Sequence, residues 1–208
     1  MYKWPGTVLT GTIRSVTGSG GRRDENRRRT GERIYSAAIQ LYEARGFDNV
    51  TVAMIAERAG VSVPTFYAHF SSKEIMLMPL PEREEIAAVL APQPIDLPPT
   101  ERAANAIFLW LELIDEHQRE PVLERWRIIA STPSLRLRTA EFERATAAVV
   151  LAALGDEKGE PMPPAVEVGI NALMSAYTQI VLRWAEDDGA RDVLEIAREV
   201  LTELRQQL

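Results

Sequence analysis

Residues 51–70 predict two short helices that meet at a sharp turn, and this pattern constrains the fold more than any other feature. Apolar residues in the first helix recur at the spacing of one helical face, and Thr51 precedes them as an N-cap. Gly60 allows the left-handed backbone that ends this helix. Ser62 caps the second helix, and Pro64 in its first turn costs little. So tight a connection indicates a helix-turn-helix.

The preceding residues predict a third helix that completes a small core. Its apolar positions from residue 34 to residue 41 follow the helical period, and Gly46 is a plausible C-cap. Val61 is expected to pack into this core beside Phe66 and Phe70. A three-helix unit of this kind projects its last helix outward, so that residues near its start reach base edges in the major groove.

We therefore expect DNA contacts from side chains on and around the outward helix. Residues near its start are placed to meet base edges, while flanking hydroxyl, imidazole and ammonium groups suit phosphate. The predicted DNA-binding residues are Thr51, Val63, Pro64, Thr65, Tyr67, His69 and Lys73. Two alternatives stay open: the segment is an ordinary helical hairpin, or Tyr67 and His69 simply pack against Phe70.

Residues 30–77 resemble the DNA-binding domain of the tetracycline-repressor-like (TetR) family. The matching positions are Gly46-Phe47, Thr51-Val52, Ile55-Ala56, Ala59-Gly60-Val61-Ser62, Thr65-Phe66-Tyr67, His69-Phe70 and Ser72-Lys73-Glu74. The resemblance covers about a quarter of the chain and implies that Thr51, Thr65, Tyr67, His69 and Lys73 contact DNA. It further implies a dimeric regulator, a repressor by family default.

The sequence departs from the family pattern at two positions. Val63 stands where relatives often carry a polar residue, and Met54 stands where they often carry an acidic one. An apolar side chain at position 63 favours contact with a thymine methyl group over hydrogen-bonded readout. We expect DNA shape, phosphate and methyl contacts to matter more here than base hydrogen bonds.

The rest of the chain predicts helices only, so the fold class is all-α. Residues 71–74 have the form of a capping box and predict a fourth helix, interrupted by Pro79 and Pro81. A proline-rich connector follows at residues 91–99. Further helices are expected at 100–118, 121–131, 134–154, 164–187 and 190–206. The predicted parts are a disordered or peripheral extension (1–21), a DNA-binding domain with a basic arm (22–78), and an effector-binding and dimerisation domain (79–208).

Charge is distributed unevenly along the chain, whose formal net charge is -6. Residues 21–78 carry nine basic and seven acidic side chains, whereas residues 79–208 carry 13 basic and 23 acidic ones. Five arginines lie within residues 22–29. This run is interpreted as a flexible arm that touches phosphate or the minor groove, or else as a solvated tail.

The second domain is expected to pair with a second copy and to hold a small molecule. The resemblance implies that the last two helices form a homodimer, and this chain offers small and apolar surface for it at Val168, Ala172, Ser175, Ala176, Gln179, Val193, Ile196, Ala197, Val200, Leu201 and Leu204. For many of these residues the alternative is a purely intrachain core. Candidate effector-binding residues are Phe108, Trp110, Ile114, His117, Trp126, Met174, Tyr177 and Trp184. This aromatic set favours an apolar or aromatic effector, although most aromatic residues at helical spacing are simply core.

Other classes of protein are disfavoured. The chain has no cysteine and two histidines, and it contains no nucleotide-binding or metalloprotease motif, so we expect no enzyme, cofactor or metal. No membrane-spanning segment is expected, and the predicted location is the cytoplasm. The predicted function is a ligand-responsive regulator that binds a palindromic operator as a dimer. The alternative is a relative that binds a ligand or a protein and does not read DNA.

Overall fold

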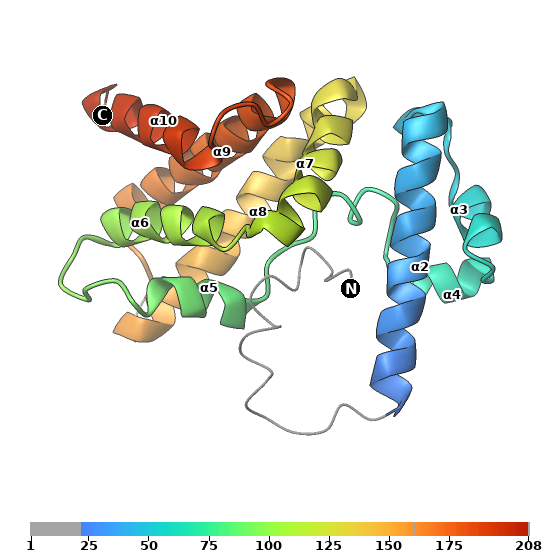
Figure 1. Cartoon of the computed structure of the whole chain (residues 1–208). Helices are drawn as coiled ribbons and strands as arrows, with labels where there is room; N and C mark the ends of the chain where they lie inside the picture. The colour runs from blue at the N-terminus through green and yellow to red at the C-terminus, as the bar shows by residue number, and fades with distance from the viewer. Residues whose placement is uncertain (1–21, 160, 208) are drawn as a thin grey trace.

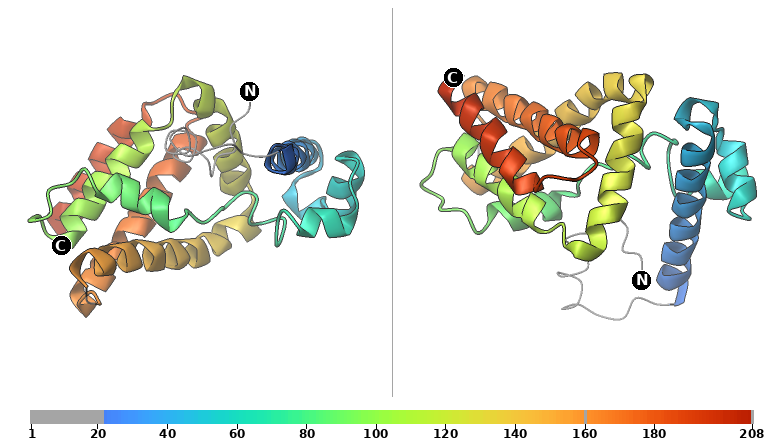
Figure 2. Two further views of the ribbon diagram at one scale, coloured as in Figure 1. Left: turned by 90° about the horizontal axis from the view of Figure 1, so that it is seen from below. Right: turned by 45° about the horizontal axis from the view of Figure 1, so that its top comes forward.

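The computed structural model describes residues 22–159 and 161–207, and within these ranges every regular element is a helix. The predicted all-helical fold is confirmed. Figure 1 shows a long helix, α2 (Arg22–Arg45), beside a bundle made by the helices that follow residue 82. Two short helices, α3 (Val52–Arg58) and α4 (Val63–Tyr67), lie on the side of α2 away from the bundle (Figures 1 and 2). The reading helix is thus left uncovered by the bundle.

The arginine run belongs to α2 and is not a flexible arm, so that expectation is wrong within the described residues. Arg28 pairs with Glu25 at 2.6 Å and with Glu32 at 2.5 Å. Pairs at these spacings lie on one helix face and stabilise the first turns. The positive charge is therefore held on a helix. The predicted extension, residues 1–21, lies outside the described part of the chain.

A buried apolar core holds α2, α3 and α4 together. Ile34 and Ala38 of α2 meet Ile55 of α3 and Phe66 of α4, and all four are fully buried. A short 3-10 helix, η3 (Phe47–Asn49), follows Gly46, whose φ of 76° ends α2 as predicted. The three-helix unit expected from the sequence is present.

The bundle is built around α9, which packs against four other helices. Its members are α5 (Arg83–Leu90), α6 (Pro99–Glu112), α7 (Glu116–Ser131), α8 (Pro133–Lys158), α9 (Pro164–Glu186) and α10 (Val193–Gln207). A Cβ placed on Gly169 would lie 2.6 Å from Cγ2 of Thr100, so α9 and α6 approach closely at this point. The central position of α9 explains its largely apolar sequence.

By length and hydropathy alone α9 is apolar enough to cross a membrane, contrary to the sequence expectation. In the folded chain, however, it is the helix around which α6, α7, α8 and α10 pack. Ile170, Ile180 and Trp184 along it are fully buried. Core helices of soluble proteins share this composition.

Two predicted helix boundaries are wrong. Residues 71–82 form turns and extended backbone instead of a fourth helix; Ser72 accepts one bond from the amide of Ile75, but no helix follows. The next helix, α5, instead begins after Glu82, with Glu85 completing its capping box. Pro121 lies inside α7, and the chain breaks earlier, where Asp115 caps that helix through the amide of Gln118.

Candidate nucleic-acid interface and ligand pocket

The turn between α3 and α4 is closed by backbone hydrogen bonds around Gly60. The amide of Val61 donates to the carbonyl of Ala56 at 2.9 Å. The amide of Gly60 donates to the carbonyl of Glu57 at 3.0 Å. This pair of bonds is a Schellman motif, which needs a left-handed residue after the helix. Gly60 supplies it with a φ of 63°. The crossing of the two helices is therefore set by local sequence.

Both short helices begin at side-chain caps that the sequence predicts. The hydroxyl of Thr51 accepts from the amide of Met54 at 3.3 Å, and the hydroxyl of Ser62 accepts from the amide of Thr65 at 3.2 Å. The hydroxyls of Ser62 and Thr65 also lie 2.8 Å apart. Thr51 is exposed, whereas Thr65 is half-buried. These hydroxyls both hold the helix ends and face the side on which DNA is expected.

The outer face of α4 presents apolar surface and one aromatic hydroxyl. Val63 is 37% exposed and Tyr67 is 54% exposed, and Pro64 is exposed as well. The Tyr67 ring meets the edge of the buried Phe66 ring at a centroid distance of 5.5 Å. This contact orients the tyrosine while its hydroxyl end stays outside the core. The face matches the predicted reading surface, and DNA contact by these residues stays a prediction.

His69 lies against α2 more than toward solvent. It is half-buried, and Arg27 of α2 donates to the carbonyl of the neighbouring Ala68 at 3.3 Å. Burial, followed by the positive charge of Arg27, lowers the pKa of His69. The neutral imidazole is thus favoured at neutral pH and offers a single N–H donor. Arg27 belongs to the arginine run, so this run reaches the end of α4.

Lys73 has a structural role that the sequence did not suggest. Its Nζ donates to the carbonyls of Phe47 at 2.9 Å and Val50 at 2.8 Å, and it lies 4.1 Å from the centre of the Phe47 ring. The ammonium thereby joins the segment after α4 to the loop before α3. One N–H of the three remains for a phosphate.

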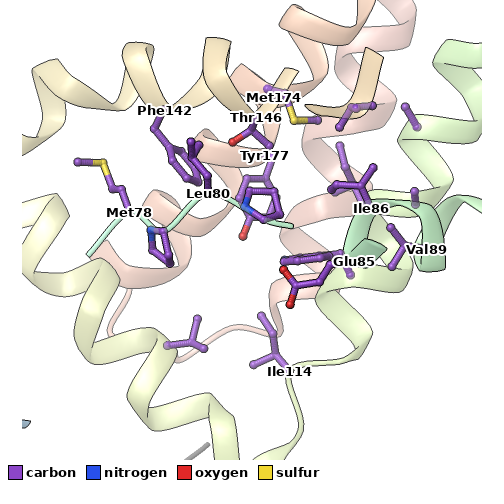
Figure 3. A pocket seen from close by; sticks show the side chains of 18 of the residues that line it. Met78, Leu80, Glu85, Ile86, Val89, Ile114, Phe142, Thr146, Met174 and Tyr177 are labelled. Carbon is purple, nitrogen blue, oxygen red and sulfur yellow. The ribbon is translucent and has the colours of Figure 1, made fainter. Parts of the chain in front are cut away.

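A partly open pocket lies within the bundle, lined by residues of α5, α6, α7, α8 and α9 (Figure 3). A volume of about 100 Å³ is open to the centres of water-sized molecules. Its walls are mostly apolar. Residues 77–81, which join the DNA-binding part to α5, form one wall. The same linker therefore lines the pocket and connects back along the chain to α4.

The pocket brings together part of the predicted effector-binding set. Its walls include Trp110, Ile114, Trp126, Met174 and Tyr177. Three other candidates, Phe108, His117 and Trp184, do not line it: His117 is exposed, while Trp184 is buried elsewhere, beneath the guanidinium of Arg119. Some aromatic residues at helical spacing thus line the pocket and others lie in the core. The spacing alone cannot predict which of the two a given residue does.

Polar side chains in the pocket were missed by the sequence reasoning. Glu85, Arg125 and Thr146 line it, and each is buried with one side-chain atom that has no hydrogen-bond partner. Figure 3 shows Glu85, Thr146 and Tyr177 among the apolar side chains. A signal existed, because Arg125 falls on the face of α7 defined by Val122 and Trp126, where a charge is unexpected.

The predicted dimer surface is only partly exposed on α9, where Ala176 is buried and Ala172 half-buried, and it is largely buried on α10. Val168, Ser175 and Gln179 lie on one exposed side of α9. On α10 the expected contact residues Val193, Ile196, Ala197 and Leu201 are buried within the chain. These four pack into the core of their own subunit, so the expectation that they face a partner is wrong for this structure. Val200 and Leu204 stay half-exposed.

Comparison with known proteins agrees with this arrangement. The family model for "Bacterial regulatory proteins, tetR family" matches residues 34–78. Over 213 residues the chain is 28% identical to the HTH-type transcriptional regulator TcmR of Streptomyces glaucescens, covering 96% of this chain and 93% of TcmR. Over 68 residues it is 46% identical to the uncharacterized HTH-type transcriptional regulator Mb2274c of Mycobacterium bovis, covering 32% and 35% of the two chains.

Solved structures share the fold. NalD of Pseudomonas aeruginosa, the secondary repressor of the MexAB-OprM multidrug efflux pump, superposes with a TM-score of 0.55 at 18% identity, covering 86% of this chain and 96% of NalD. A putative TetR-family regulator from Syntrophomonas wolfei gives 0.54 at 19% identity, covering 86% and 94%. At these identities the likeness concerns the fold alone.

Proposed function

Because the chain belongs to the TetR family of transcriptional regulators, we propose that it is a ligand-responsive repressor of bacterial transcription. It binds a palindromic operator as a homodimer in the cytoplasm, and a small apolar or aromatic molecule in the pocket releases it. Its relatives are regulators and not enzymes.

The observation that carries this proposal is the shared wall of the pocket. Leu77 and Met78 are buried and line the pocket, and they follow closely after Lys73, which ties the loop before α3. A ligand that packs against residues 77–81 therefore acts on backbone continuous with the DNA-reading unit. A ligand shifts an equilibrium only if it binds the two states differently, and a wall continuous with the DNA-reading unit offers a place for such a difference.

The dimer is supported by symmetry and by the free side of α9. Two reading helices are needed to meet two half-sites of a palindrome, one helical turn of DNA apart. The side of α9 with Val168, Ser175 and Gln179 is exposed and offers one apolar, one small and one amide side chain to a partner helix. Val168 is 70% exposed, so its side chain is open to a partner.

The test is a fluorescence anisotropy titration of the full chain with the DNA upstream of its own gene, at a fixed 100 mM salt concentration. We expect saturable binding that resists an excess of unrelated DNA, because specific complexes exceed non-specific ones by about a thousandfold or more. Analytical ultracentrifugation of the complex should give two chains per operator. Equal binding to both DNAs would reject the proposal and favour the adaptor that binds ligand without reading DNA.

A further inference from the structure

Arg125 is the least expected residue of the pocket wall. It is 7% exposed, and its Nε is buried without a hydrogen-bond partner. Within residues 22–159 and 161–207, no carboxylate forms an ion pair with it and no acceptor binds its guanidinium. Its guanidinium carbon lies 6.0 Å from the centroid of the Trp126 ring, and its positive charge opposes the rise that burial causes in the pKa of Tyr177.

Such an arrangement is costly unless a ligand completes it. An arginine stays charged inside proteins, and a buried charge without a partner is strongly disfavoured. The other buried arginine of this region shows the usual solution: Arg102 pairs with Glu157 at 2.5 Å and donates to the carbonyl of Leu90. Arg125 has no equivalent partner, although it faces a cavity large enough for a small molecule.

The neighbouring polar groups favour an anion over a cation. Burial raises the pKa of Glu85 and also that of Tyr177, so this apolar site disfavours the negatively charged form of both groups. One carboxyl oxygen of Glu85 accepts from the backbone amide of Glu82 at 2.9 Å, while the other has no partner. Thr146 adds a hydroxyl whose hydrogen bond is also unmet. The hydroxyls of Thr146 and Tyr177 can donate to a ligand oxygen beside Arg125.

We propose that the effector carries an acidic group, such as a carboxylate or an ionised phenol or enol, and that Arg125 binds this group while the aromatic walls enclose an apolar body. This inference rests on the proposed function in treating the pocket as the effector site. It assigns Arg125 as the specificity-determining residue of that site. A charge-assisted bond in a dry pocket selects an anion against its uncharged counterpart.

The experiment compares two fluorescent probes that differ by one anionic group. Both 8-anilinonaphthalene-1-sulfonate and uncharged N-phenyl-1-naphthylamine are titrated into the full chain without DNA. We expect the sulfonate to bind at least about tenfold more tightly, and Arg125→Met to lose that preference while binding the uncharged probe within about twofold. Equal affinities in the wild type, or no saturable sulfonate binding, would overturn the proposal.

Two controls separate the pocket from other sources of the effect. Arg138→Met removes an exposed arginine of α8 and should leave both affinities unchanged; a loss there equal to that of Arg125→Met would mean surface adsorption and reject the assignment. Without ligand, Arg125→Met should unfold at the same or a higher temperature, because methionine removes an unpaired buried charge. A clear fall would show that Arg125 is paired within the fold.

DNA binding is measured separately in the same variants. The wild type and Arg125→Met should bind the upstream DNA equally in the absence of ligand, since Arg125 lies in the bundle. Loss of probe selectivity with intact DNA binding supports the proposal. Absence of DNA binding in both proteins would reject the regulator function while leaving the anion selectivity of the pocket measured on its own.

Discussion

The ammonium nitrogen of Lys73 lies 2.8 Å from the carbonyl oxygen of Val50, joining the segment after the reading helix to the loop before α3. A second bond to the carbonyl of Phe47 and the contact with its ring complete this attachment. Lys73, which the family resemblance assigns to DNA contact, thus holds two segments of the protein together. Its effect on DNA binding has to be separated from its effect on folding.

Lys73→Met should lower the free energy of unfolding by about 1–2 kcal/mol, because two hydrogen bonds from a charged donor are lost at a partly buried site. Urea denaturation measures this change. Lys73→Arg retains the charge and should recover part of the stability. Unchanged stability of the methionine variant, together with weaker DNA binding, would instead make phosphate contact the main role of Lys73.

Tyr67→Phe should weaken operator binding by roughly fivefold to tenfold, the effect of one lost hydrogen bond, without a change in unfolding temperature. The phenyl ring keeps the edge contact with Phe66, and the hydroxyl of a residue that is 54% exposed contributes little to the core. Anisotropy titration and thermal denaturation give the two quantities. If affinity is retained, the Tyr67 hydroxyl does not touch DNA.

Gly60→Ala should destabilise the protein by about 1–2 kcal/mol, from backbone strain alone. The φ of Gly60 is 63°, and an added Cβ would meet no atom within 4 Å. Gly60→Asn, which tolerates this backbone better, should cost less. Gly169→Ala offers the contrasting case, since its Cβ would lie 2.6 Å from Thr100. Equal stability of the alanine and asparagine variants at position 60 would contradict the assignment to backbone strain.

The carboxyl groups of Glu124 in α7 and Glu43 in α2 meet where the two parts of the chain touch. Burial, followed by the charge of Glu43, raises the pKa of Glu124 to about 7. The folded state therefore holds a proton that the unfolded chain releases near the ordinary glutamate pKa of 4.5. The stability that this proton gives the folded state is fully present below pH 4.5, and it is lost as the pH rises through about 7.

Glu124→Gln should remove this dependence. The unfolding temperature of the variant minus that of the wild type should be larger at pH 8 than at pH 5. Circular dichroism measures both unfolding temperatures. Glu116→Gln, an exposed change on the same helix, serves as the matched control. A constant difference between Glu124→Gln and the wild type at both pH values would show that Glu124 shares no proton with Glu43.

Sequence alone determined the features that depend on neighbouring residues. The caps at Thr51 and Ser62, the left-handed turn at Gly60 and the helical period of the bundle are local, because a cap or turn is formed by atoms three or four positions apart. The helix-turn-helix and the all-helical class could therefore be predicted. The fourth helix failed because a capping-box pattern at residues 71–74 does not specify whether a helix follows.

Only the tertiary structure decided which side chains share a space. Trp110 and Trp184 look alike in their helical patterns, yet one lines the pocket and the other lies in the core. The isolation of Arg125 depends on what five helices and a linker place around it, and the internal use of Lys73 depends on a loop more than 20 positions earlier. Contacts of this kind arise from packing between distant segments, which no local pattern of residues encodes.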